Sequence, residues 1–529
     1  MATLAARRAT NIEVTQAALE EKSKLQQHFG RFDMLFFLIC TLVGLDTIGT
    51  VAAKGAQAFT WLILLGIFFF VPYALIVSEL GSAFPDEGGP YMWPRLAFGR
   101  FIASINTIVY WIANPIWVGG SLAIVAISAY STFFVDITSN KNAEYIFAFC
   151  FIWFTIVSAI ISFQYGKWIP TLGAICRIVV LAFFTLSVII YAFKHGVHGF
   201  GGSDFGVSYV GFIGLVPVLF FNYVGFELPS AAGEEMKDPT RDVPFAVLRS
   251  AAGTVLLYGG PILAILLVLP VSQITSLSGF LTAIKSVFTV YGGHVTSTGA
   301  VLTGAGQGLG YIMSIAFIIA LLTSGSTWIM GSDRTEAVAS FDGAGPRVLG
   351  IFSRRFGTPI VVNFLSGIMG TVVMILAFNL TSGNAGKYFT VVLGLAISTT
   401  TISYIGIFPA IIKLRYSHPE IERPYRIPFG NAGAWICGVL CEFWAVFATI
   451  VLIWPGFGLG WFGNKLNADS SLATGFTRGE YEKSQIIPLI VLFALGAVFY
   501  MLGTPTRSHL ADTLPPDALP PQMTEPAPA

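Results

Sequence analysis

Apolar runs long enough to cross a bilayer recur along most of this chain of 529 residues. The hydrocarbon core of a membrane is about 30 Å thick, so a helix needs about 20 apolar residues to span it. Counting such runs predicts twelve membrane-spanning helices and leaves no charge-rich stretch long enough for a soluble domain. We therefore expect an all-α integral membrane protein, with spans near residues 33–53, 58–81, 98–131, 144–164, 170–193, 208–232, 247–270, 308–331, 359–380, 387–414, 434–455 and 486–503.

The amino-acid composition supports a membrane protein and argues against other classes. The chain is 55% hydrophobic and 11% charged, whereas a soluble protein carries about 25% charged residues. Its net charge of +1 gives no reason to expect a nucleic-acid partner. The five cysteines all lie in apolar runs, without the spacing of a metal site or a disulfide framework. We predict no bound metal and no cofactor.

The distribution of lysine and arginine predicts how the chain is oriented. Of its 29 basic residues, 20 fall in loops on the side of the N-terminus, 8 fall on the other side, and Arg177 lies within a span. Basic residues concentrate on the cytoplasmic side, so both termini are expected in the cytoplasm of a plasma-membrane protein. Residues 1–31 would form a cytoplasmic segment without the apolar core of a cleavable signal peptide. Residues 505–529 are proline-rich and are expected to form a disordered cytoplasmic tail.

The sixth apolar run contains residues that a simple membrane helix avoids. Gly225 and Pro229 weaken the helical ladder, and Glu227 places a carboxyl group at membrane depth. Two interpretations of the glycine and proline are open: an ordinary kink, or a broken helix whose free backbone groups line a binding site. Glu227 also has two: a structural partner for a buried arginine, or a functional group that faces a cavity.

A similar interruption occurs in the first apolar run, where residues 44–49 include Asp46 and two glycines. The two interrupted runs are five spans apart, and an odd spacing gives the two halves opposite orientations. Interrupted helices in corresponding positions are typical of inverted-repeat membrane proteins with a binding site near the midplane. We expect a first repeat over residues 32–195, a second over 206–415, and two further spans over 430–504.

Four stretches carry a family resemblance. Residues 84–93 are similar to a pattern FP-x-x-GG-x-Y, and residues 225–227 place an acidic residue after a glycine and a hydrophobic residue. An acidic pair followed by Pro-x-Arg-x-x-Pro occupies 234–244, and similar loop motifs lie within 333–359. Together these stretches resemble the amino acid–polyamine–organocation superfamily of permeases, and within it the bacterial amino acid permeases. The resemblance extends over residues 30–430.

The resemblance implies the leucine-transporter fold: ten core helices in two inverted five-helix repeats, with helices 1 and 6 broken, and two peripheral helices. It implies alternating access for amino acids, by proton-coupled symport or exchange, with polyamines or other organic amines as the alternative substrates. The expected partners are a small-molecule substrate, the lipid bilayer and protons; no oligomeric state is predicted. A membrane enzyme is disfavoured because the predicted spans hold no histidine, metal cluster or nucleophile–base motif. A transceptor, which has a transporter fold but mainly signals, is a further rival.

In this family the substrate binds to backbone groups that the two broken helices leave free. Half-helix N-termini favour anions and C-termini favour cations. Helix packing by small residues is the competing interpretation. Carried over to this chain, the resemblance assigns substrate binding to Val43, Gly44, Leu45, Asp46, Thr47, Gly49, Phe221, Asn222, Tyr223, Gly225 and Glu227.

Asp46 departs from the family, in which this break is small and neutral. An ionised Asp46 would compete with a substrate carboxylate, which favours a polyamine or a basic amino acid. Alternatively, Asp46 pairs with Arg177 and is structural, because buried charges are usually paired. Arg177 falls near the place where proton-coupled relatives carry a lysine and related transporters bind sodium. Arginine cannot release its proton, so proton coupling would need a carboxyl group such as Glu227, Asp46 or Glu79.

Further side chains are candidates for coupling or gating. Residues 323–327 are rich in hydroxyl groups, which suit a sodium site but also bond to backbone carbonyls within membrane helices. An aromatic ring can cap an organic cation, whereas core packing or an interfacial belt is the competing explanation. The coupling or gating set is Arg177, Glu227, Asp46, Trp111, Asn114, Trp117 and Trp328.

Overall fold

The computed structural model describes residues 15–25, 30–165, 168–296, 299–380, 384–455, 457 and 477–509. The predictions for 1–14 and 510–529, which include most of the expected C-terminal tail, lie outside these residues. Within the described part, eleven helices are long and apolar enough to cross a membrane. The first predicted span is not among them, because a break divides it into two short helices. These eleven spans, together with the divided first span, account for the twelve predicted.

The first half of the chain runs from the N-terminal helix to the fifth span. Thr15 caps helix α2 by accepting a hydrogen bond from the Ala18 amide. A π-helical turn lies within the second span and another within the third. The elements are α2 (Gln16–Lys22), α3 (Arg31–Leu42), α4 (Ile48–Ala52), α5 (Gln57–Leu65), η1 (Gly66–Phe70), α6 (Val71–Ala83), α7 (Gly89–Phe98), α8 (Arg100–Trp117), η2 (Val118–Leu122), α9 (Ala123–Phe133), α10 (Lys141–Tyr165) and α11 (Trp168–His195).

The second half begins with the sixth span, which is also divided. Its parts are α12 and the 3₁₀ segment η4, and a two-stranded antiparallel hairpin follows later. The elements are η3 (Gly202–Phe205), α12 (Tyr209–Tyr223), η4 (Leu228–Glu235), α13 (Pro239–Val268), η5 (Val271–Gln273), α14 (Gly279–Phe288), β1 (Gly293–Thr296), β2 (Gly299–Leu302), α15 (Gly304–Phe341), η6 (Arg347–Gly350), α16 (Ile360–Leu380), α17 (Ala385–Ile407), α18 (Ala410–Ser417), α19 (Gly430–Ile453), α20 (Arg478–Leu502) and α21 (Thr504–Arg507).

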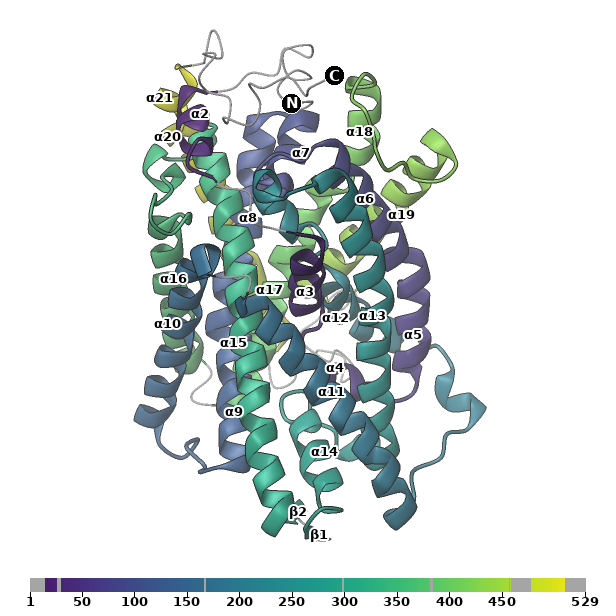
Figure 1. The fold of residues 1–529 in the computed structure, drawn as a ribbon. Helices are drawn as coiled ribbons and strands as arrows, with labels where there is room; N and C mark the ends of the chain where they lie inside the picture. Colours follow the sequence, from purple (N-terminus) through teal and green to yellow (C-terminus); the bar gives the residue numbers. More distant parts are fainter. Residues whose placement is uncertain are drawn as a thin grey trace, which may run out of the picture.

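The broken helices lie inside the bundle, and the unbroken ones surround them (Figure 1). Helix α3 packs against α11, α13 and α15, whereas α12 packs against α5, α17 and α19. The helices α2, α7, α18 and α21 gather at one end of the bundle, which we call the terminal face (Figure 1). The hairpin β1–β2 and helix α14 lie at the opposite end (Figure 1).

Large apolar side chains cover the outside of the bundle. Phe154 of α10 is 64% exposed, and Ile490 of α20 is 62% exposed. Soluble proteins rarely expose extensive apolar surface, so lipid is the expected solvent of these faces. The interior, in contrast, holds many buried polar groups near the breaks, which include Asp46, Arg177 and Glu227. The polar interior therefore lies where the two helices are interrupted.

Candidate substrate-binding site

The break in the first span lies between α3 and α4. Within it the Gly44 amide donates to the Tyr258 hydroxyl (2.7 Å), and that hydroxyl donates to the Leu42 carbonyl (2.9 Å). Tyr258 of α13 therefore satisfies two backbone groups that an interrupted helix leaves without partners. Part of the amide set that the resemblance assigns to a substrate carboxylate is thus occupied by a side chain.

The break in the sixth span depends on Gly225. Its φ is +128°, a conformation that other residues rarely adopt. A Cβ atom there would lie 2.6 Å from Thr41 Cγ2 and 3.0 Å from the Trp328 ring. The amides of Gly225 and Phe226 donate to the Tyr73 hydroxyl at 3.0 and 2.9 Å. The helix is therefore broken here rather than kinked.

The two breaks meet through their side chains. The Thr47 hydroxyl donates to Asn222 Oδ1 at 2.6 Å, which joins the first break to the last turn of α12. Asn222 is 4% exposed, and its Nδ2 group has no hydrogen-bond partner among the described residues. A buried polar group without a partner costs free energy unless a ligand or water satisfies it. The junction therefore contains an open hydrogen-bond donor.

Asp46 lies at the same junction and is 2% exposed. Its Oδ2 atom accepts hydrogen bonds from Trp117 Nε1 and Ser121 Oγ, both at 2.8 Å. Its Oδ1 atom is buried without a partner among the described residues. One oxygen is thus fixed by the third span, and the other is buried without a hydrogen-bond partner among the described residues.

Arg177 is fully buried, but its hydrogen bonds go elsewhere. Its guanidinium donates to the carbonyls of Val43 and Ala320, each at 2.7 Å, and to Cys40 Sγ at 3.1 Å. No ion pair within 4 Å joins it to Asp46 in the described structure. Arg177 therefore bridges α3 to α15, and its charge acts on Asp46 only from a distance.

Glu227 follows the second break and is completely buried. Its Oε1 atom accepts hydrogen bonds from Tyr110 (2.7 Å) and Tyr404 (2.6 Å), and its Oε2 atom accepts one from Tyr73. Three hydroxyls from three helices thus enclose the carboxyl group. Tyr73 also accepts the two amides of the break, so it links the broken backbone directly to Glu227.

The aromatic candidates divide into two groups. Trp117 lies 5.9 Å from Phe221 and 6.3 Å from Trp328, between ring centroids, and these rings border the junction of the breaks. Trp328 donates to the Thr41 carbonyl at 3.1 Å. Trp111, in contrast, donates to Asp333 at 2.9 Å. The structure brings Trp117 and Trp328 to the breaks but turns Trp111 toward another buried carboxyl group.

Several other predicted residues make contacts that serve packing. The side chain of Asn114 donates to the Tyr110 carbonyl of its own helix, and the Tyr223 hydroxyl donates to the Leu62 carbonyl. A Cβ at Gly49 would lie 2.8 Å from the Ser276 carbonyl oxygen, so this glycine allows a close backbone approach. Leu45 is buried in the apolar core. The contacts of these residues therefore indicate roles in packing and in close backbone approach.

The hydroxyl-rich stretch of α15 bonds mainly to backbone carbonyls. Thr323 donates to Ile319, and Thr327 donates to Thr323, as is common in membrane helices. The Ser324 hydroxyl donates across to the Cys40 carbonyl at 3.3 Å. The coupling candidate Glu79 is ion-paired with Arg415 and also accepts the Ile427 amide. These groups are therefore already satisfied within the protein.

A cluster of carboxylates lies at the terminal face, where η4 ends. We call Asp86, Glu87, Glu234 and Glu235 the acidic rim. Arg334 of α15 donates to Glu87 at 2.8 Å and also to Glu235. Burial raises the pKa of Glu87, while the charge of Arg334 acts in the opposite direction. The rim joins the loop after α6 to the end of the sixth span.

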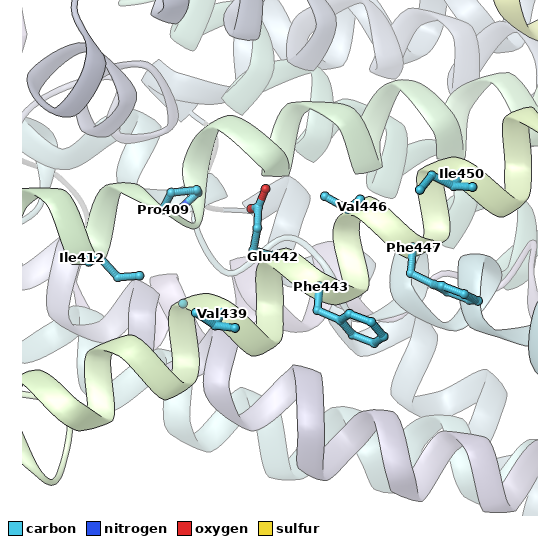
Figure 2. Close-up of a pocket in the computed structure, with 9 residues that line it drawn as sticks. Pro409, Ile412, Val439, Glu442, Phe443, Val446, Phe447 and Ile450 are labelled. Carbon is cyan, nitrogen blue, oxygen red and sulfur yellow. The ribbon is translucent and has the colours of Figure 1, made fainter.

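A cavity of about 420 Å³ lies away from both breaks, between α18 and α19 (Figure 2). Its lining is apolar except for Glu442, which Figure 2 shows among valine, isoleucine and phenylalanine side chains. None of its lining residues belongs to the two interrupted spans. The candidate site is therefore the junction of the breaks rather than this cavity.

Several residues at the site were not among the sequence-based candidates. They are the partners of the break residues: Ser121 at Asp46, Tyr258 at Gly44, and Tyr73, Tyr110 and Tyr404 at Glu227. Each is a polar side chain inside a predicted span, which was the available signal. The sequence could not tell which of the many such residues face the breaks.

Known proteins are similar to this chain in sequence and in fold. Residues 29–467 match the amino acid permease family. An uncharacterised transporter of Legionella pneumophila is 30% identical over 413 residues, covering 76% of this chain and 84% of that protein. The probable agmatine/putrescine antiporter AguD of Lactococcus lactis is 25% identical, covering 81% and 87%. The branched-chain amino acid permease BcaP of Bacillus subtilis is 23% identical, covering 80% and 88%.

The fold is that of solved transporters. A crystal structure of a single-residue mutant of the Eremococcus coleocola manganese transporter superposes with a TM-score of 0.57, covering 92% of this chain and 97% of that one. The identity is 12%, so this likeness concerns the fold alone. It confirms the leucine-transporter fold that the family resemblance implies. With a family match over most of its length, the chain belongs to the amino acid permease family, and it is a multi-pass membrane transporter rather than an enzyme.

Proposed function

We propose that this transporter carries small organic amines across the plasma membrane, with Asp46 as the counter-charge of the substrate ammonium group. The observation that carries the proposal is the Asp46 carboxyl group: it is buried at the junction of the breaks, and its Oδ1 atom has no partner among the described residues. Arg177 does not neutralise it by an ion pair, because the guanidinium is bound to backbone carbonyls. A cationic ligand supplies the missing charge.

The surroundings of Asp46 suit an organic cation better than a substrate carboxylate. Opposite charges attract more strongly in a poorly solvated cavity than in water, and like charges repel more strongly. The Gly44 amide, which could otherwise donate to a substrate carboxylate, already donates to the Tyr258 hydroxyl. The rings of Trp117, Phe221 and Trp328 border the junction and can contact an alkylammonium through their faces.

The similarity to the agmatine/putrescine antiporter supports this substrate class. Both of those compounds are amines that carry positive charge and lack a carboxylate. A second candidate is an amino acid, supported by the similarity to the branched-chain amino acid permease. Among amino acids, a basic one would fit best, because its side-chain ammonium could pair with Asp46. Exchange of a diamine for a related amine is the reaction that we favour.

We also propose how transport is coupled and oriented. Arg177 supplies a permanent cation between Val43 and Ala320, so sodium is not required. Glu227 is the carboxyl group proposed to carry a proton, since its three tyrosine partners can donate to either charge state. The terminal face is proposed to be cytoplasmic, on the basis of the excess of lysine and arginine in its loops. The repeats 32–195 and 206–415 each contribute one break to the site.

Competition against a transported tracer in proteoliposomes tests the substrate class. Putrescine and agmatine should displace labelled putrescine, and leucine should displace it weakly. In Asp46→Asn the uptake of labelled putrescine should be lost, because the counter-charge is gone. Displacement by neutral amino acids alone, unchanged in Asp46→Asn, would contradict the proposal. Uptake of no amine and no amino acid would favour a transceptor instead.

A further inference from the structure

We propose that the acidic rim is a second binding site for a primary ammonium group of the substrate, and that Lys22 of the N-terminal helix occupies it when that helix is docked. The proposal rests on the proposed function, because it assigns a staging site to the same cationic substrate. The rim is the group Asp86, Glu87, Glu234 and Glu235 at the terminal face.

The Lys22 side chain already places an alkylammonium group in the rim. Its ammonium pairs with Glu234 and lies 4.0 Å from Asp86. A lysine side chain ends in the same group as a linear diamine, a primary ammonium on a flexible alkyl chain. The contacts of the Lys22 ammonium therefore illustrate how the rim would hold the terminal ammonium group of a substrate.

The rim also holds an acceptor that remains open. Glu235 is 3% exposed; its Oε1 atom accepts from Arg334, but its Oε2 atom is buried without a hydrogen-bond partner in the part of the chain described. A primary ammonium has three donors and can bond several carboxylate oxygens at once. Glu87 Oε2 accepts the Glu234 amide at 3.3 Å, so these carboxylates lie in one connected group. The rim is a partly satisfied acceptor set next to a resident ammonium.

One short segment, η4, connects the second break to the rim. The segment η4 starts at Leu228, immediately after Glu227, and ends at Glu235. Its eight residues do not form one regular helix, because the backbone of Ala232 (φ −116°, ψ 41°) is not helical and kinks the segment. The Gly88 amide donates to the Ala231 carbonyl, and a Cβ at Gly233 would lie 2.7 Å from the Asp86 carbonyl oxygen. The rim loop therefore packs tightly along the half-helix that begins at the second break.

The N-terminal helix is anchored independently of Lys22. Thr15 Oγ1 donates to the Phe341 carbonyl at 2.6 Å, and Glu21 accepts the Phe352 amide at 2.9 Å. Arg347 pairs with Glu21 at 2.9 Å. Because these contacts hold α2 on α15 and on the segment after it, Lys22 can act as a tethered competitor. Substrate arriving at the rim displaces the Lys22 ammonium, not the whole helix.

The test compares the two faces of the membrane. Putrescine exchange is measured in inverted vesicles, which present the terminal face outward, and in right-side-out vesicles. Lys22→Ala should lower the half-saturating putrescine concentration about fivefold in inverted vesicles and change it less than twofold in right-side-out vesicles. Glu234→Gln should raise it in inverted vesicles only. Lys237→Ala is the matched control, because it removes an exposed positive charge just after Glu234 and Glu235. It should leave the half-saturating concentration unchanged in both kinds of vesicle.

Three outcomes would overturn the proposal. The first is no change of the half-saturating putrescine concentration with Lys22→Ala, and the second is an equal change on both faces of the membrane. The third is the same change for leucine exchange, which would mean that Lys22 restrains a conformational change rather than competing with the substrate. Binding of labelled putrescine to purified Asp46→Asn separates this proposal from the proposed function. With the central counter-charge removed, adding Lys22→Ala should increase the remaining binding, and adding Glu234→Gln should abolish it. If putrescine is not transported but this pattern holds, the proposed function fails and the rim site stands.

Discussion

The two breaks each carry a buried carboxyl group, but the surroundings of the two groups differ. Asp46 in the first break and Glu227 after the second are 2% and 0% exposed. Neither forms an ion pair within 4 Å among the described residues. Glu227 has donors on both oxygens, whereas Asp46 has both of its side-chain donors on one oxygen.

This difference indicates different roles for residues of the same chemistry. Both oxygens of Glu227 already accept hydrogen bonds, so we expect this carboxyl group to serve the internal network and the proposed coupling step. A carboxyl group with one open oxygen incurs a desolvation cost that a cationic ligand relieves. We therefore expect the placement of donors, rather than the position in a break, to distinguish the proposed recognition residue Asp46 from Glu227.

The largest effect is expected when each carboxyl group is replaced by its amide. Asp46→Asn should weaken putrescine binding by about 3 kcal/mol, or about 100-fold, because it removes the buried charge that pairs with the ammonium. Glu227→Gln should change the same affinity less than threefold, because both oxygens of Glu227 already accept hydrogen bonds from tyrosine hydroxyls. Scintillation-proximity binding to purified protein measures both values.

The same pair of variants can break the comparison. A large loss of affinity in Glu227→Gln, with little in Asp46→Asn, would reverse the two roles. An equal loss in both would mean that both carboxyl groups contact the substrate. Thermal unfolding of each variant controls for stability: Glu227→Gln is expected to unfold at lower temperature, because an amide NH₂ would face hydroxyl donors.

Much of this comparison was accessible from the sequence, but its decisive part was not. Apolar run lengths and the charges at Asp46 and Glu227 predict the spans and the two breaks, because these properties are local in sequence. The roles of the two carboxyl groups depend on Trp117 in one case and on Tyr404 in the other. These partners are 71 and 177 residues away, and periodicity does not specify which helix faces meet.

Arg177 illustrates the same limit. Its burial within a span was evident from the sequence, and both a pairing with Asp46 and a replacement of sodium were reasonable. Which of these two roles Arg177 takes depends on carbonyls that become free only when a helix is interrupted, such as the carbonyl of Val43. Which carbonyls are free is a property of the broken backbone, not of residue identity. The contact with Ala320 likewise depends on how α15 packs against α11.

The second effect concerns the tyrosines that enclose Glu227. Tyr73→Phe removes a donor to Glu227 and also the acceptor of the Gly225 and Phe226 amides. It should destabilise the protein by about 2 kcal/mol, since buried groups would be left without partners. Tyr110→Phe removes only one donor and should cost about 1 kcal/mol. Thermal unfolding in detergent gives the order, and equal losses would mean that the break does not depend on Tyr73.

The third effect tests whether the donor to Asp46 matters for recognition. Trp117→Phe keeps a ring at the site but removes the hydrogen bond to Oδ2, and it should weaken putrescine binding by about 1 kcal/mol, roughly fivefold. Trp111→Phe is the matched control, because the same helix presents this indole to Asp333 instead. It should reduce stability and leave affinity within twofold. A comparable loss of affinity in both variants would indicate a general disturbance of the third span.

The smallest effect is an expected absence of change, and it concerns the buried Arg177 guanidinium. Arg177 donates to the carbonyls of Val43 and Ala320, where a bound sodium ion would otherwise need such oxygens. Because arginine keeps its charge at all physiological pH values, uptake in choline buffer should equal uptake in sodium buffer. Arg177→Ala leaves those carbonyls without the guanidinium, so sodium stimulation is expected in this variant alone. Strict sodium dependence of the wild type would show that the guanidinium does not take the place of the sodium ion. A sodium ion bound near Asp46 would then be part of the comparison between the two carboxyl groups.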